Sequence, residues 1–134
     1  MMQELLVKTT KHQEIVIISD KIKDIIKSSK LNQGICNIYS TNTTATLIVN
    51  EVSEPNLRED IMNIFNKIVP MHDNYNHDKL DNNANAHLKS TLVGCNLNIP
   101  FKDSKLLLGK WQDIALIELD GPRERKLIVS LIKI

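Results

Sequence analysis

Residues 112–134 read QDIALIELDGPRERKLIVSLIKI, two apolar segments on either side of a short polar turn. The segments 112–119 and 125–133 are rich in isoleucine, leucine and valine, a composition typical of β-strands. Asp120-Gly121-Pro122 supplies turn-forming residues between them. Connections in this part of the chain are too short for a crossover, so its strands are expected to be antiparallel.

The rest of the chain adds strands by alternation and helices by their 3.6-residue spacing. Further strands are expected at 3–10, 14–18, 35–40, 44–50, 95–99 and 105–108. Helices are expected at Ser19 or Asp20 to Ser29, about Ser53 to Val69, and as a short turn at 86–93 ending at Gly94. The order is ββαββα, a polar loop, then ββββ. It predicts an α+β protein: one compact domain, residues 1–134, with a mostly antiparallel or mixed, sandwich-like sheet and helices on one side.

Local signals add detail to this prediction. Ser19 or Asp20 is expected to cap the first helix, and Gly34 to end the connection that follows it. The apolar face of the first helix is expected to be Ile18, Ile22, Ile25 and Ile26, and that of the second Leu57, Ile61, Ile64, Phe65 and Ile68. The segments 35–40 and 44–50, separated by three polar residues, are expected to pair.

Composition excludes several classes of protein. With 42% apolar and 25% charged residues, the 134-residue chain is globular in composition. A net charge of +1 gives no bulk attraction for nucleic acid, so no nucleic-acid partner is expected. No apolar run approaches the roughly 20 residues of a membrane span, and the N-terminus lacks a signal-peptide pattern. The chain is therefore expected to be cytoplasmic, without a membrane partner, and to keep Cys36 and Cys95 reduced.

The familiar short motifs of catalysis are absent. The sequence has no GxxxxGK[ST], GxGxxG, HExxH or GxSxG pattern. Four glycines are too few for a glycine-rich phosphate cradle. A phosphate site in this chain must therefore use arginine, lysine, hydroxyl groups or a helix N-terminus.

One long polar segment stands out. Half of residues 71–86 are asparagine or aspartate, and polar connections of this length are often functional. If the segment folds back, His77 and His87 can meet, and an imidazole pair with a carboxylate suits a divalent ion or proton transfer. The alternative is a pair of structural histidines that satisfy loop carbonyls.

Three further residues have two interpretations each. The guanidinium of Arg123, after a Gly-Pro turn, suits a phosphate or carboxylate, or an ordinary surface ion pair. Trp111, the single tryptophan, suits either stacking on a flat ring or a place in the core or a subunit interface. Glu51 suits an acid in a site or a favourable charge near a helix start.

Several segments in order resemble the YjbQ family, whose members are often described as secondary thiamine-phosphate synthases. The segments are Gly34 through Asn42-Thr43-Thr44-Ala45, Val49-Asn50-Glu51, Tyr75-Asn76-His77-Asp78, Asn85-Ala86-His87-Leu88-Lys89-Ser90, Gly94 to Ile99-Pro100, Leu108-Gly109-Lys110-Trp111-Gln112 and Glu118 to Arg125.

The resemblance implies a homotrimer with polar motifs near its subunit boundaries and a site built from the histidines of three motifs. Two of these positions fall on His77 and His87. The third holds Asn42, where family members commonly carry histidine. An asparagine cannot act as an imidazole base and is a poor zinc ligand. A three-histidine metal site is therefore reduced here to two histidines with an acid or water.

Three functions stay open. In the first, a thiazole phosphate displaces pyrophosphate from a hydroxymethylpyrimidine diphosphate. The second is metal-dependent hydrolysis of a phosphorylated metabolite, and the third is non-catalytic binding of a small anion by a trimer. The expected catalytic residues are His77, His87 and Glu51, with His77 and His87 also as ligands of Mg or Zn. The expected substrate-binding residues are Asn42, Thr43, Thr44, Asn85, Lys89, Ser90, Trp111, Gln112 and Arg123.

Overall fold

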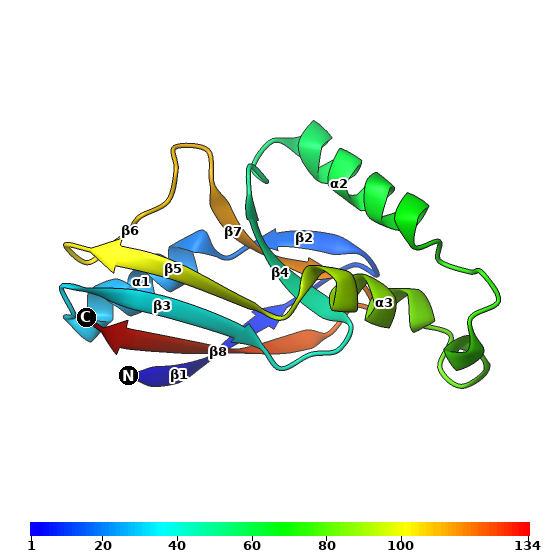
Figure 1. The fold of residues 1–134 in the computed structure, drawn as a ribbon, viewed down its shortest axis with the longest axis horizontal. Helices are drawn as coiled ribbons and strands as arrows, with labels where there is room; N and C mark the ends of the chain where they lie inside the picture. The colour runs from blue at the N-terminus through cyan, green and yellow to red at the C-terminus, as the bar shows by residue number, and fades with distance from the viewer.

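Eight strands divide between two antiparallel sheets in the computed structural model, which describes residues 1–134 (Figure 1). The larger sheet has the order β1 (Met2–Lys8), β8 (Glu124–Lys133), β3 (Gln33–Ser40), β5 (Asn96–Lys102) and β6 (Lys105–Leu106). The smaller sheet has the order β2 (Glu14–Ile17), β7 (Asp113–Glu118) and β4 (Ala45–Asn50). The helices are α1 (Ser19–Ser29), α2 (Pro55–Ile68) and α3 (Ala84–Val93), with a 3₁₀ turn η1 (Asn76–Lys79). The α+β class and the antiparallel pairing are confirmed.

Apart from β5 and β6, which pair with each other, strands that are neighbours in the sequence lie in different sheets. The predicted pairing of 35–40 with 44–50 is wrong, because β3 pairs with β5 and β8 whereas β4 pairs with β7. Likewise β7 and β8, joined by the Gly-Pro turn, belong to different sheets. Each of these short connections therefore carries the chain from one sheet to the other.

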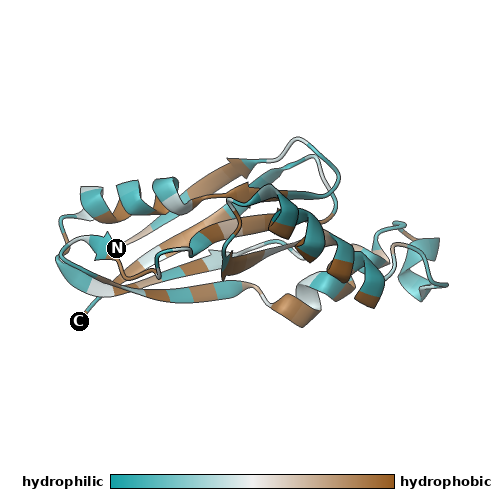
Figure 2. Cartoon of the chain, turned by 90° about the horizontal axis from the view of Figure 1, so that it is seen from above, coloured by the Kyte–Doolittle hydropathy of each residue, from teal (hydrophilic) through white to brown (hydrophobic).

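The core lies between the two sheets. Alternate residues of the larger sheet, such as Cys36, Ile38 and Val129, are buried against Leu47 and Leu116 of the smaller one. Ile22, Ile25 and Ile26 of α1 join the same cluster. Figure 2 shows hydrophobic residues concentrated on the strands and hydrophilic residues along the outer side of α1. No helix covers the outer face of the larger sheet, where Tyr39 and Ile132 stay exposed, so the helices lie on one side of that sheet.

Helix α1 has the predicted bounds, but its N-cap is not the predicted one. Ser19 does not cap it; the hydroxyl of Ser19 donates to Asp113 (2.6 Å) and accepts from the backbone N–H of Ile114 (2.9 Å), which ties the helix to β7. The helix ends at Lys30 in a left-handed conformation. Gly34 lies within β3 instead, where a Cβ would come within 2.1 Å of the carbonyl oxygen of Ile132.

Helix α2 covers the far face of the smaller sheet and is only partly buried. The carboxylate of Glu54 caps it by accepting from the backbone N–H groups of Asn56 and Leu57. Ile61 and Phe65 pack against the sheet as predicted. The prediction is wrong for Ile64 and Ile68, which are 46% and 64% exposed, because the sheet supports only one edge of the apolar face.

The polar segment is more ordered than a loop. It contains η1 and the first residues of α3, which is longer than the predicted turn and ends at Gly94 with a φ of 103°. Helix α3 packs on β4, so the segment returns to the edge of the smaller sheet (Figure 1). No helix in the structure has both the length and the apolar character required to cross a membrane.

Candidate functional site

The two histidines of the polar segment meet. The rings of His77 in η1 and His87 in α3 contact edge to face, with centroids 4.9 Å apart and planes at 88°. The segment between them is folded back by Asp78, whose carboxylate accepts from the backbone N–H of Ala84 at 3.0 Å. The hydroxyl of Tyr75 donates to the carbonyl of Pro70 and holds the beginning of the segment. His77 and His87 are therefore close in the folded chain.

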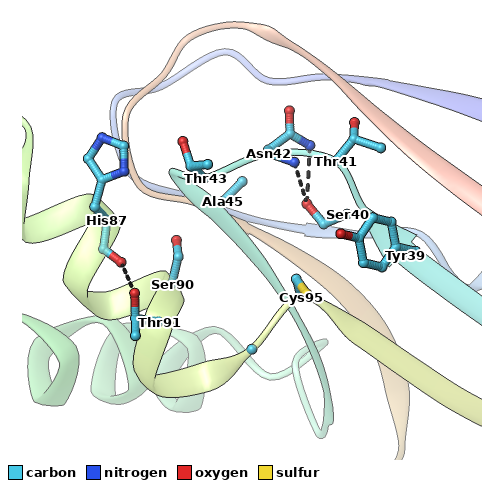
Figure 3. Close-up of a pocket in the computed structure, with 11 residues that line it drawn as sticks. Tyr39, Ser40, Thr41, Asn42, Thr43, Ala45, His87, Ser90, Thr91 and Cys95 are labelled. Atoms are coloured by element: carbon cyan, nitrogen blue, oxygen red, sulfur yellow. Dashed lines mark hydrogen bonds between the residues drawn. The ribbon is translucent and has the colours of Figure 1, made fainter.

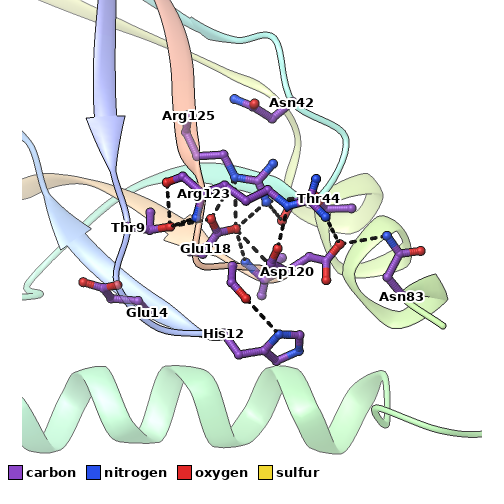
Figure 4. Close-up of polar contacts among 12 residues, drawn as sticks. Thr9, His12, Glu14, Asn42, Thr44, Asn83, Glu118, Asp120, Arg123 and Arg125 are labelled. Atoms are coloured by element: carbon purple, nitrogen blue, oxygen red, sulfur yellow. Dashed lines mark hydrogen bonds and ion pairs between the residues drawn. The ribbon is translucent and has the colours of Figure 1, made fainter. Parts of the chain in front are cut away.

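His87 lines a polar hollow of about 580 Å³, which we call the arginine pocket. It lies where the end of β7 and the start of β8 approach the β3–β4 connection and α3 (Figure 4). None of its lining residues is apolar. They are Thr41, Asn42, Thr43, Thr44, Asp81, Asn83, His87, Asp120, Arg123 and Arg125.

Arg123 is held at the wall of this pocket. Its Nε donates to the carbonyl oxygen of Asp120 at 2.8 Å, and its Nη2 donates to the carboxylate of Asp120 at 2.9 Å. The backbone N–H of Arg123 donates to the hydroxyl of Thr9 at 2.8 Å. The side chain of Asn83 donates to the same carboxylate of Asp120. Nη1 of Arg123 has no hydrogen-bond partner in the chain.

Arg125 lies deeper and is 4% exposed. Its Nε donates to both carboxylate oxygens of Glu118, at 2.8 and 3.0 Å, and its Nη2 donates to Glu118 and to the hydroxyl of Thr44. Burial alone raises the pKa of Glu118, but hydrogen bonds from Arg125, from Thr9 and from the backbone of Asp120 outweigh it and lower the pKa. Glu118 is therefore charged near neutrality, and its charge fixes the guanidinium.

A second hollow of about 580 Å³, which we call the hydroxyl pocket, lies between α3 and the β3–β4 connection (Figure 3). Its lining is Tyr39, Ser40, Thr41, Asn42, Thr43, Ala45, His87, Ser90, Thr91, Gly94 and Cys95. Thr41, Asn42, Thr43 and His87 line both hollows. Asn42 is anchored between them, because its side-chain amide donates to the hydroxyl of Ser40 and to the carbonyl of Lys126.

Unused hydrogen-bonding capacity gathers at the same place. Three buried side-chain atoms lack a partner: Nε2 of His77, Oδ1 of Asn83 and Oγ of Ser90. Asn83 lines the arginine pocket, Ser90 lines the hydroxyl pocket, and His77 contacts His87. Because buried polar atoms are normally hydrogen-bonded, this concentration marks a region that can gain bonds from a ligand.

The donor set does not fit a zinc ion within one subunit. No group of three or more histidine, cysteine, aspartate or glutamate side chains is arranged to hold a metal. The nearest carboxylate contact of His77 is Asp81, at 3.7 Å from Nε2. Zinc sites use at least three protein ligands, so His77 and His87 do not form a zinc site within one subunit.

Lys89 and Asn85, predicted to bind substrate, lie in a buried cluster instead. The ammonium group of Lys89 donates to the side-chain oxygens of Asn85 (2.6 Å) and of Asn66 in α2 (2.7 Å). Asn66 also exchanges hydrogen bonds with Gln13. Burial lowers the pKa of Lys89 to about 8. Within one subunit these residues hold α3 to α2.

Glu51, Trp111 and Gln112 lie at the far end of the smaller sheet. The strand β4 starts beside the pockets at Ala45 and ends at Asn50, which is paired with Asp113 of β7. Six residues of strand place Glu51 and Trp111 about 20 Å from the pockets. Trp111 is 64% exposed, and the side-chain oxygen of Gln112 accepts from the backbone of Gly109. A single subunit therefore does not bring these residues to His87.

Sequence reasoning did not assign five of the pocket residues: Thr41, Asp81, Asn83, Asp120 and Arg125. A signal was present for two of them, because Asp120 and Arg125 flank the same Gly-Pro turn as Arg123. No local pattern distinguishes Asp81 and Asn83 from the other polar residues of their segment. Their place depends on how η1 leads into α3.

Fold and site together define a small α+β protein of two antiparallel sheets, with two adjoining polar hollows at one end of the smaller sheet. The chain belongs to the family described as UPF0047 protein YjbQ-like, whose model matches residues 3–134. The resemblance found in the sequence is thus confirmed. Membership of this family assigns no activity to the chain.

Relatives match along nearly the whole chain. A UPF0047 protein of Archaeoglobus fulgidus is 43% identical over 127 residues, which cover 95% of this chain and 98% of that one. The UPF0047 protein YugU of Bacillus subtilis is 31% identical over 132 residues, covering 98% of both chains. The crystal structure of a YbjQ-like protein of unknown function from Sulfolobus solfataricus is similar with a TM-score of 0.95 and 35% identity, covering 100% of this chain and 97% of that one.

Proposed function

We propose that this protein binds a small phosphorylated metabolite in the arginine pocket, with His87 as the proton donor or acceptor beside it. The observation that carries the proposal is a hollow without apolar lining in which two fixed guanidinium groups each retain an unpartnered Nη1. Planar guanidinium groups bind phosphate oxygens well. The hydroxyl of Thr44 accepts from Arg125, so its own hydrogen is available to a phosphate oxygen.

The charges of the pocket favour hydrogen bonding over bulk attraction. Asp120 pairs with Arg123 and Glu118 pairs with Arg125, so each guanidinium is already neutralised in part. The groups that remain for a ligand form directional hydrogen bonds: they are two Nη1 groups, threonine hydroxyls and the imidazole of His87. We therefore expect moderate affinity for phosphate and strong dependence on ligand shape.

The activity that we propose is of the thiamine-phosphate synthase type. The ring nitrogen of a thiazole phosphate would attack the methylene carbon of a hydroxymethylpyrimidine diphosphate, and the carbon–oxygen bond to pyrophosphate would break. Arg123 and Arg125 would stabilise the charge of the leaving pyrophosphate. His87 would supply a proton to it, and the adjoining hollows would hold the two reactants together.

Binding without turnover is the second candidate. Asn42 takes the place where related proteins commonly carry histidine, and its amide is already used by Ser40 and Lys126. An asparagine cannot move a proton as an imidazole does. The same pocket would then act as a metabolite-binding site alone.

We also propose a homotrimer, working in the cytoplasm. Ile64, Ile68 and Leu92 leave an apolar surface on α2 and α3, being 46%, 64% and 68% exposed. A neighbouring subunit is the means by which Trp111 could approach the pockets of another chain. The two cysteines are unpaired, as is usual in reducing compartments. Light scattering should give three times the 15.3 kDa of one chain, and a monomer would contradict the trimer.

Calorimetric titration with pyrophosphate tests the binding site. The variant Arg123→Ala should bind it at least about tenfold more weakly, because a hydrogen bond to a charged group contributes about 1.5–3 kcal/mol. Arg58→Ala, the matched control on α2, should bind as the wild type does. Equal affinity in Arg123→Ala and the wild type would contradict the proposed site.

A coupled assay with both thiamine precursors tests catalysis. Thiamine phosphate should form with the wild type and at least about a hundredfold more slowly with His87→Ala, in line with the loss of a general acid. Equal rates in the two proteins would end the catalytic proposal. Pyrophosphate binding without any turnover would support the second candidate.

A further inference from the structure

The two pockets meet at His87 but differ in chemistry. The arginine pocket contains two arginines and two aspartates, whereas the lining of the hydroxyl pocket contains no aspartate, glutamate, lysine or arginine. We infer that the hydroxyl pocket holds the uncharged organic part of the phosphorylated ligand, and that Ser90 determines specificity for it. The inference rests on the proposed function, because it takes the phosphate to lie in the arginine pocket.

The pockets are continuous along one stretch of chain. Thr41, Asn42 and Thr43 line both, and so does His87 from the opposite side. Figure 3 places Thr43 and Ser90 opposite each other, with His87 at one end of the hollow and Tyr39 and Cys95 at the other. A ligand whose phosphate contacts Arg123 would therefore extend past His87 between the β3–β4 connection and α3.

The hydroxyl pocket is suited to a neutral group. A carboxylate or ammonium group placed there would lose water and find no opposite charge apart from a protonated His87. Tyr39 and Cys95 offer apolar contact to carbon atoms at the end away from His87, and Ala45 does so nearer the middle of the hollow. We expect a phosphate ester of a small uncharged ring or chain, and discrimination against esters that carry a second charge.

Ser90 carries the buried hydroxyl of this pocket that lacks a hydrogen-bond partner. The Ser40 hydroxyl accepts from the backbone and side chain of Asn42, and the Thr91 hydroxyl donates to the carbonyl of His87 at 2.8 Å. The Ser90 oxygen is buried and has no hydrogen bond. A polar atom of the ligand's organic part would satisfy it, and this bond would select among esters.

A matched pair of esters tests the inference by calorimetry. Glycerol 3-phosphate and 3-phosphoglycerate have three-carbon chains that end in a neutral hydroxyl and a carboxylate, respectively. The wild type should bind glycerol 3-phosphate at least about tenfold more tightly, since an unpaired charge costs more than 1.4 kcal/mol to bury. Equal affinities would overturn the inference.

Variants at Ser90 separate this inference from the proposed function. Ser90→Ala should weaken glycerol 3-phosphate binding about fivefold and leave inorganic phosphate binding unchanged, whereas Ser90→Thr, which retains a hydroxyl, should retain affinity. Ser28→Ala, at an exposed position of α1 outside both pockets, serves as the control. If Ser90→Ala binds both ligands as the wild type does, the inference about Ser90 fails but the proposed function stands. If the wild type binds neither phosphate nor ester, the proposed function fails and the inference with it.

Discussion

Arg125 and Glu118 form a buried ion pair that joins the two sheets. Arg125 belongs to β8 of the larger sheet and Glu118 to β7 of the smaller, and their side chains are 5% and 0% exposed. Glu118 also accepts from the hydroxyl of Thr9 and from the backbone of Asp120 (Figure 4). The pair therefore fixes the turn that carries Arg123, and the core and the arginine pocket share one polar network.

Removing one partner of this pair should destabilise the protein strongly. Arg125→Met leaves the carboxylate of Glu118 buried without a charge partner, at a cost of about 3–5 kcal/mol in the free energy of unfolding. The double variant Glu118→Leu/Arg125→Met removes both charges and should recover much of that loss. Urea unfolding measures both variants. A single variant within about 1 kcal/mol of the wild type would show that the pair is not shielded from water.

The same pair should make stability depend on acid pH. Burial raises the pKa of Glu118, but the hydrogen bonds from Arg125, Thr9 and the backbone of Asp120 together with the charge of Arg125 outweigh it, so the folded pKa lies below the ordinary value of 4.5. The stabilisation is then fully present above pH 4.5 and is lost as the pH falls through the lower folded value. Urea unfolding between pH 3 and 6 should show a smaller decrease for Glu118→Gln than for the wild type. Parallel curves would contradict the assignment.

Lys89 should make stability depend on pH in the alkaline range. Burial lowers its pKa from 10.5 to about 8, and its partners Asn66 and Asn85 are neutral. Between these two values the unfolded chain binds more protons than the folded one, so the free energy of unfolding rises with pH. Urea unfolding at pH 7.5 and 9.5 should show this rise in the wild type. In Lys89→Met, which has no ammonium group, the free energy of unfolding should not show this rise. An equal rise in the variant and the wild type would refute the role of Lys89.

The sequence predicts the elements of this fold well but not their pairing. Every strand and α-helix lies within a few residues of its expected place, because periodicity and turn residues are local signals, whereas the 3₁₀ turn η1 was not expected. The predicted pairing of β3 with β4 was wrong because a short polar connection is compatible both with a hairpin and with a passage from one sheet to the other. The structure shows how the two strands differ: residues 114–119 are continuously buried, as in a strand covered on both faces, whereas burial alternates along β8.

The part of the candidate site that depends on the polar segment folding back was predictable from the sequence. His77 and His87 meet, and His87 shares a hollow with Arg123. Lys89 lies close to His87 in the sequence and was therefore predicted to belong to the site. Its side chain lies on the face of α3 opposite the pockets, where its ammonium group donates to Asn66 and Asn85 between the helices. Spacing along the chain does not fix which face of α3 meets the β3–β4 connection. The sequence alone therefore could not show that Ser90 lines the hydroxyl pocket and Lys89 does not.

The two cysteines should differ sharply in reactivity. Cys36 is fully buried in the core, and burial raises the pKa of its thiol to about 11. Cys95 is partly exposed and lines the hydroxyl pocket. Because the thiolate is the reactive form, an aromatic disulfide reagent at pH 8 should label one thiol of the native protein. Cys95→Ser should abolish that fast phase, and Cys36 should react only as the protein unfolds.

Occupation of the hydroxyl pocket should then slow the labelling of Cys95. A phosphate ester that extends past His87 approaches the Cys95 end of the hollow, whereas inorganic phosphate in the arginine pocket stays away from it (Figure 3). Saturating glycerol 3-phosphate should therefore reduce the labelling rate several-fold, and saturating phosphate should leave it unchanged. Equal protection by both ligands would mean that the ligand closes the whole region and does not fill one hollow. Labelling unaffected by the ester would place its organic part elsewhere, since a thiol beside a bound ligand loses access to the reagent.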